Sequence, residues 1–111
     1  MNGYLLDTNV ISEFSKKKPD ERVRKWVDAQ NEAILYLSVL TRFKDRLLPV
    51  TDGIAEIWGS MAAKAQSEGI TLGAIDGLLG ATAANHDLTV ATRNGLDFRA
   101  CNVALVNPWD F

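Results

Sequence analysis

The amino-acid sequence predicts an α/β fold, with a mostly parallel sheet and helices between its strands, in one domain that spans residues 1–111. Short apolar runs of strand length alternate with segments whose apolar residues recur at helical spacing. No two-residue hairpin turn obviously joins one predicted strand to the next, which favours parallel pairing. A 12.2 kDa chain with 47% hydrophobic residues can bury roughly two-thirds of its surface, which is enough for one core.

The first half of the chain predicts three strands and one helix. Residues 4–6 are a short buried strand that stops at the polar tip Asp7-Thr8-Asn9, where all three residues favour turns and helix N-caps. A helix starts at Asp20-Glu21, because acidic residues match the positive end of the helix dipole. Further strands are expected at 35–40 and 46–50.

The second half predicts two helices and two strands. A long helix runs from residue 51 to Gly69, which stops it after an apolar stripe, and an alanine-rich helix covers 74–87. Strands follow at 88–92 and 103–106, and Asn94-Gly95 between them is a turn signal. The chain then ends in the tail Asn107-Pro108-Trp109 and two further residues.

The connection between the second and third strands conflicts with a purely parallel sheet. Parallel neighbours need a crossover of a dozen or more residues, whereas only residues 41–45 separate these two strands. Three explanations fit the sequence. The strands pair antiparallel, they are not neighbours in the sheet, or the chain lacks a helical segment at this point.

Charge and cysteine content limit the possible binding partners and the cellular location of the protein. The net charge of −2 gives no global basicity for nucleic-acid binding, although residues 1–46 carry a balance of +2 and residues 47–111 one of −4. Lys16-Lys17-Lys18 is interpreted as a solvated loop, with a phosphate-contacting patch as the alternative. A lone cysteine, Cys101, and the absence of any apolar run near ~18 residues predict a cytoplasmic protein that does not span a membrane.

Polar side chains follow the predicted strands where ligands collect in open α/β sheets, at the carboxyl ends. Asp7 ends the first strand, Asp76 opens a late helix, and Asn94 and Asp97 follow a later strand. Carboxylates gathered without a neighbouring Lys or Arg repel one another unless a divalent cation neutralises them, which predicts a Mg²⁺ or Mn²⁺ site. One histidine and one cysteine argue against Zn²⁺.

Each of these residues also has a structural interpretation. Asp7 can cap the turn beside it, Asp76 can be the N-cap of a helix over 77–84, and Asp97 can cap a bend. Thr92 can make a local hydrogen bond at a strand end. Only convergence in space distinguishes a functional site from these separate roles.

Five segments occur in an order that resembles VapC-type PIN-domain proteins, close to the FitB branch of bacterial toxin–antitoxin modules. The resemblance covers nearly the whole chain and implies a three-layer α/β/α fold and a metal-dependent endoribonuclease that is held inactive by a VapB-like antitoxin. Operator DNA is then bound only through the antitoxin. The segments are Leu5 to Glu13, Leu35 to Thr41, Ile75-Asp76 with Ala81 to Ala83, Leu88 to Asn94, and Asn107 to Trp109.

By position, the resemblance implies that Asp7, Asp76 and Asp97 are metal ligands, directly or through water. Asn94 belongs to the catalytic group, and Thr92 and Asn9 support it. Arg93 is a candidate RNA contact, and a solvent-facing arginine is the alternative.

The sequence departs from the family pattern between Thr41 and Arg42, where the helix bearing the family's second acid, a glutamate, and the helix after it are absent. A deficit of roughly 25–30 residues is expected from ordinary helix and loop lengths. Two alternatives follow: a catalytically impaired decoy that binds antitoxin, and, more distantly, a receiver-like signalling domain. Loss of a helix pair also exposes apolar surface, which predicts a homodimer.

Overall fold

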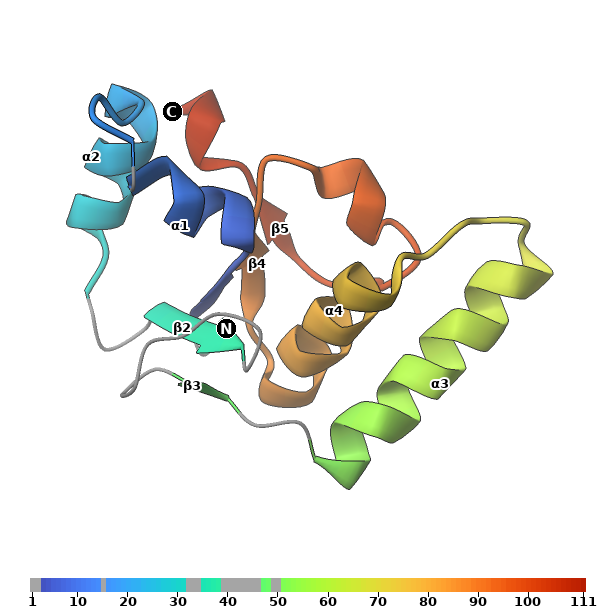
Figure 1. Cartoon of the computed structure of the whole chain (residues 1–111). Helices are drawn as coiled ribbons and strands as arrows, with labels where there is room; N and C mark the ends of the chain where they lie inside the picture. Colours follow the sequence, from blue (N-terminus) through green and yellow to red (C-terminus); the bar gives the residue numbers. More distant parts are fainter. Residues whose placement is uncertain (1–2, 15, 32–34, 39–46, 49–50) are drawn as a thin grey trace.

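The sheet contains five strands in the part of the chain that the computed structural model describes, which is residues 3–14, 16–31, 35–38, 47–48 and 51–111. Their order is β3-β2-β1-β4-β5, and all four neighbouring pairs are parallel (Figure 1). This confirms the α/β prediction. The strands are β1 (Tyr4–Leu6), β2 (Leu35–Ser38), β3 (Leu47–Leu48), β4 (Thr89–Ala91) and β5 (Leu105–Val106).

Two apolar cores lie on opposite faces of this sheet, because successive strand residues point to opposite sides. Leu5 and Val90 belong to the core covered by α3 (Asp52–Ser67) and α4 (Ala74–His86). Their neighbours Leu6 and Ala91 belong to the other core, together with α1 (Thr8–Phe14), α2 (Glu21–Ala29) and the C-terminal turn η3 (Pro108–Asp110). The fold therefore has the expected three layers.

Helices α2 and α3 begin where their capping residues predict. Asp20 accepts a hydrogen bond from the backbone N–H of Arg22, and Thr51 caps α3 through the N–H of Ile54. The glycine stop also holds, since Gly69 has a φ of +69°, a conformation that favours glycine. No helix of the described residues is long and apolar enough to cross a membrane.

One helix, α1, is missing from the sequence prediction. The polar tip 7–9 was predicted as the end of a strand, yet Thr8 starts a two-turn helix directly after Asp7. The side chain of Asp7 accepts a hydrogen bond from the N–H of Thr8, so the tip acts at a helix start instead of a turn.

Strands β2 and β3 are parallel neighbours, with Leu37 opposite Leu47 and Ser38 opposite Leu48. The explanations by antiparallel pairing and by separation in the sheet are therefore wrong, and the lack of a helical segment remains. The connection itself, residues 39–46, lies outside the described residues, as do the ends of the predicted strands at 39–40, 46 and 49–50.

Candidate metal centre

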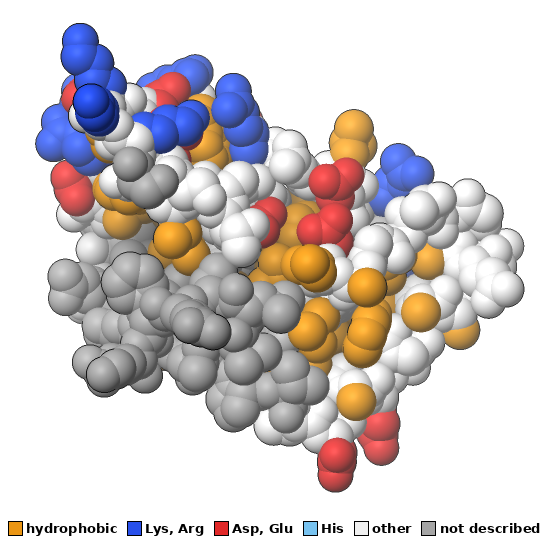
Figure 2. All heavy atoms as spheres, viewed as in Figure 1, with side chains coloured by type: hydrophobic (Ala, Val, Ile, Leu, Met, Phe, Trp, Pro, Cys, Tyr) orange, Lys and Arg blue, Asp and Glu red, His pale blue; other side chains and the backbone are white. Residues whose placement is uncertain are grey.

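The candidate site lies at the carboxyl ends of the two central strands. Leu6 of β1 stands opposite Ala91 of β4, so the next residues, Asp7 and Thr92, leave the sheet side by side. The start of α4 and the 3₁₀ turn η2 (Gly95–Phe98) reach the same region. Figure 2 shows acidic side chains gathered in the middle of this face.

Asp7 is a buried carboxylate held by four donors. The Thr92 hydroxyl donates to Oδ2 at 2.8 Å and the Asn9 amide to the same oxygen at 3.3 Å. Oδ1 accepts from the backbone N–H of Thr8 at 2.7 Å and from its hydroxyl at 3.3 Å. Only 6% of the surface of Asp7 is exposed, and these bonds fix the orientation of its carboxylate.

Thr92 and Asn9 link the ends of both strands into one network. The Thr92 oxygen, which donates to Asp7, accepts from the Asn9 amide at 3.3 Å and from the backbone N–H of Asn94 at 3.0 Å. The side-chain oxygen Oδ1 of Asn9 accepts from the backbone N–H of Arg93 at 3.4 Å. Thr92 does make hydrogen bonds at a strand end, but one partner lies 85 positions away in sequence.

Asp76 does not cap its helix, so that structural interpretation is wrong. Gly73 holds the N-cap position without a side-chain bond, and Asp76 is the third residue of α4. Its carboxylate is half-buried, and burial raises its pKa, as do the negative charges of Asp7 and, more weakly, Asp97. The negative charges of Asp7 and Asp97, which come from two other segments, thus act on the Asp76 carboxylate.

Asn94 and Asp97 lie on the exposed rim of this region. Instead of a tight turn, Asn94-Gly95 starts η2, and the side chain of Asn94 makes no capping bond there. Asp97 is exposed within η2, where its backbone N–H bonds to the carbonyl of Asn94. Of these two residues, Asp97 is close enough for its charge to act on Asp76.

The donor set suits a hard cation, since it contains three carboxylates and an amide oxygen. Within the described residues, however, no three His, Cys, Asp or Glu side chains stand close enough together to hold a metal ion. One physical reason is visible at Asp7, where both oxygens are engaged by donors of Thr8, Asn9 and Thr92.

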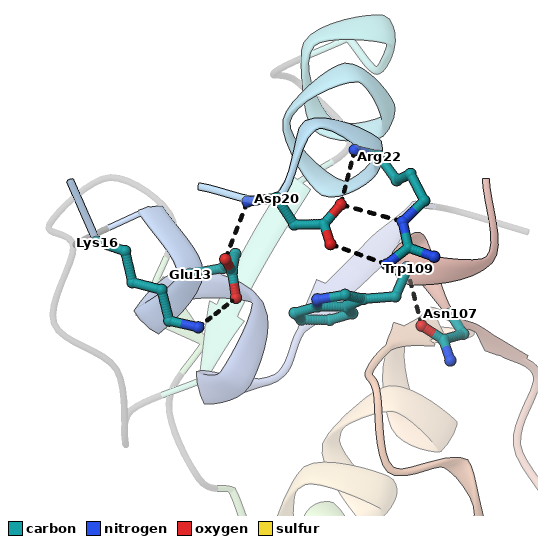
Figure 3. A network of polar contacts seen from close by, with 6 residues as sticks. All are labelled: Glu13, Lys16, Asp20, Arg22, Asn107 and Trp109. Carbon is teal, nitrogen blue, oxygen red and sulfur yellow. Dashed lines mark hydrogen bonds and ion pairs between the residues drawn. The ribbon is translucent and has the colours of Figure 1, made fainter. Parts of the chain in front are cut away.

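Glu13 is a buried acidic residue that the sequence analysis did not single out. It lies in the last turn of α1, and its carboxylate accepts from Lys16 Nζ and from the backbone N–H of Asp20, each at 3.0 Å (Figure 3). The hydrogen bond from Lys16 is the main cause that lowers its pKa. Glu13 thus ties α1 to the start of α2, and without the prediction of α1 no sequence signal marked it.

Known proteins of similar sequence identify the family of this chain. No protein-family model matches the sequence. The chain is 35% identical to toxin FitB of Neisseria gonorrhoeae over 95% of this chain and 97% of that protein, and 32% identical to VapC ribonuclease Y4jK of Sinorhizobium fredii over 96% and 97%.

Solved structures agree with this class. The crystal structure of FitAcB from Neisseria gonorrhoeae matches with a TM-score of 0.89 and 34% identity, covering 97% of this chain and 99% of that one. DNA-bound VapBC from Salmonella typhimurium shares the fold, with a TM-score of 0.80 at 20% identity. These relatives are toxins of toxin–antitoxin modules. The chain belongs to the VapC/FitB family of PIN-domain toxins.

The alignment with FitB is longer than this chain. It extends over 135 residues with FitB yet includes only 95% of the 111 residues here, so FitB has roughly 30 residues without a counterpart in this chain. The strand order 3-2-1-4-5 differs from the 2-1-3-4-5 order of receiver domains, so the receiver-like alternative is set aside.

Proposed function

We propose that this chain is a Mg²⁺- or Mn²⁺-dependent endoribonuclease toxin of a type II toxin–antitoxin module. The observation that carries the proposal is that Asp7 at the end of β1, Asp76 in the first turn of α4 and Asp97 in η2 come together at the carboxyl edge of the sheet, where the charges of Asp7 and Asp97 act on Asp76. None of the ion pairs among the described residues reaches these carboxylates, so the negative charge there is left for a cation.

Each residue has a separate part in this reaction. Asp7, fixed by its donors, sets the position of the centre, while Asp76 and Asp97 supply charge from the start of α4 and from η2. Asn94 adds an amide oxygen at the rim, and Thr92 and Asn9 keep Asp7 oriented. These residues would hold the cation, which when bound would supply an activated water and stabilise the charge that develops on the phosphate oxygens during phosphodiester cleavage.

The partners we propose follow from the relatives. Solved structures show FitAB bound to a DNA fragment and VapBC complexes, which supports a VapB-like antitoxin for this chain and contact with operator DNA only through it. Self-association as a homodimer is part of the proposal. Because the proposed substrate is RNA, the proposed site of action is the cytoplasm.

Cleavage of a labelled single-stranded RNA with and without Mg²⁺ or Mn²⁺ tests the proposal. Asp76→Asn and Asp97→Asn should each abolish metal-stimulated cleavage, because each removes one of three site charges. Asp28→Asn on the exposed side of α2 removes the same charge elsewhere and should leave cleavage unchanged. Full activity in Asp76→Asn would reject the assignment.

A second candidate function is a decoy that binds antitoxin without cleaving RNA. Two observations favour it: no three-ligand geometry exists among the described residues, and FitB has roughly 30 residues that this chain lacks. Co-purification with the antitoxin encoded beside it, together with no metal-stimulated cleavage, identifies the decoy. Metal-stimulated cleavage by the purified chain excludes it.

A further inference from the structure

Arg93 is an exposed arginine whose backbone belongs to the network of the candidate metal centre. It stands between Thr92, which donates to Asp7, and Asn94 at the rim. Its backbone N–H donates to the side-chain oxygen Oδ1 of Asn9 at 3.4 Å, and the side-chain NH₂ of Asn9 donates to Asp7. The chain direction at Arg93 is therefore set by the same bonds that orient the buried carboxylate.

The other end of Arg93 is held by an aromatic ring. Its guanidinium carbon lies 5.1 Å from the centroid of the Trp109 ring, which is the geometry of a cation–π contact. Trp109 is itself rigid: its side chain is 5% exposed, and its backbone N–H donates to Asn107 Oδ1 at 2.9 Å (Figure 3). The tail segment Asn107-Pro108-Trp109 thus presents a fixed platform to Arg93.

Arg93 and Arg99 form no ion pair among the described residues, whereas the two arginines of α2 do. Arg22 is paired with Asp20 at 2.9 Å, and Arg24 is paired with Glu21 at 2.8 Å. Among the described residues, no carboxylate pairs with Arg93. A guanidinium that stacks on a ring keeps its N–H edge available, and that edge matches the oxygens of a phosphate.

We propose that Arg93, positioned by Trp109, binds a phosphodiester of single-stranded RNA beside the candidate metal centre. The inference rests on the proposed function and names the surface by which its substrate is held. An acidic cluster repels the RNA backbone, so a fixed cation next to it is needed to hold the strand there. Arg93 acts as a substrate-binding residue, and Trp109 is a positioning residue.

The experiment measures RNA binding apart from cleavage. Fluorescence anisotropy with a labelled single-stranded RNA is recorded over a salt series in the Asp76→Asn protein with Mg²⁺ present. Arg93→Gln should weaken binding roughly tenfold and reduce the slope of log affinity against log salt by about 0.7, the loss of one phosphate contact. Arg24→Gln, which removes an equal charge that is already paired, should change neither quantity.

Two further variants test the role of the ring. Arg93→Lys keeps the charge but loses the flat stacking edge, so it should retain the salt slope with a smaller loss of affinity. Trp109→Leu should weaken binding and also lower the melting temperature, because the ring it removes is buried in the core. Trp109→Phe keeps an aromatic ring under Arg93, so it should retain most of the binding. In the Arg93→Gln background, Trp109→Phe should have no further effect on RNA affinity.

Equal RNA affinities of Arg93→Gln and Arg24→Gln overturn the inference and leave the proposed function standing. A loss confined to duplex DNA of the same length also overturns it, because Arg93 is then a DNA contact. If the parent protein binds no RNA at all, the proposed function fails together with the inference.

Discussion

The two faces of the sheet are stabilised in different ways. The face under α3 and α4 is an apolar core in which helices approach closely: a Cβ on Gly77 would lie 2.7 Å from Nε1 of Trp58. The face under α1, α2 and the C-terminal turn packs aromatic rings, with Tyr4 and Trp26 edge to face at 5.0 Å. At the edge of the second face, Glu13 forms an ion pair with Lys16 and accepts a hydrogen bond from the backbone N–H of Asp20. No ion pair of this kind lies on the first face among its described residues.

This difference explains how the candidate site is assembled. Tight apolar packing fixes α4, and with it the backbone of Asp76. Hydrogen bonds and ion pairs fix the other layer, which holds Asp7 in place at the end of β1 and Arg93 beside Trp109. Substitutions that enlarge side chains between α3 and α4 should therefore destabilise the protein. In the layer of α1, α2 and the C-terminal turn, substitutions that remove charges should have the larger effect.

The largest expected effect comes from filling the tight face. In Gly80→Ala, the new methyl group would lie 2.8 Å from Cβ of Cys101 and closer still to its sulfur, so packing must shift. We expect a loss of about 3 kcal/mol in the free energy of unfolding, measured by urea denaturation. Gly59→Ala on α3 is the matched control, because nothing lies within 4 Å of its Cβ, and it should stabilise the protein by about 0.5–1 kcal/mol. Equal stability of both variants would contradict the close packing of α4.

A smaller effect is expected from Asp7→Asn in the polar network. Both carboxylate oxygens accept hydrogen bonds, and the amide group of asparagine would face a donor at one of these positions. We expect a loss of about 1–2 kcal/mol by the same urea measurement. The exposed control Asp28→Asn should stay within about 0.5 kcal/mol of the parent protein. No loss in Asp7→Asn would mean that the network does not hold Asp7 in solution.

The smallest effect concerns pH and the ion pair at the start of α2. The guanidinium of Arg22, bonded to both carboxylate oxygens, lowers the pKa of Asp20 from its usual 3.8 to about 2. A depressed pKa gives stability that is present above pH 3.8 and lost as the pH falls toward 2. Asp20→Asn keeps the cap but not the charge. Its melting temperature should lie below that of the parent above pH 4 and converge with it near pH 2, whereas a constant difference would exclude the ion pair as the cause.

The elements that were predicted correctly are those with local signals. Thr51 and Gly69 delimit α3 by capping and by a positive φ, and the apolar run at 89–91 is buried on both sides. Helix α1 was missed because Asp7-Thr8-Asn9 favours turns and helix starts alike. Parallel pairing of β2 with β3 could not be chosen from sequence, because it depends on contacts between strands.

From the sequence, only the positions of the candidate site residues relative to the strand ends could be predicted. Strand ends placed Asp7 and Thr92 together, because both follow neighbouring parallel strands. The sequence could not show that the Asp7 oxygens are occupied by internal donors, or that Asp76 lies inside α4 instead of capping it. The first fact depends on how the side chains around Asp7 are oriented. The second depends on the residue at which α4 begins, which is Ala74 after the N-cap Gly73.

Thermal unfolding with increasing Mn²⁺ tests most directly whether Asp7, Asp76 and Asp97 form one metal centre. A cation that binds only the folded chain raises stability by about 2.7 kcal/mol at 100 times its dissociation constant. We predict that the melting temperature of the parent protein and of Asp28→Asn rises with Mn²⁺ and that the rise disappears in Asp97→Asn, whose side chain is exposed and supports no packing. An equal rise in Asp97→Asn and the parent protein would contradict the account.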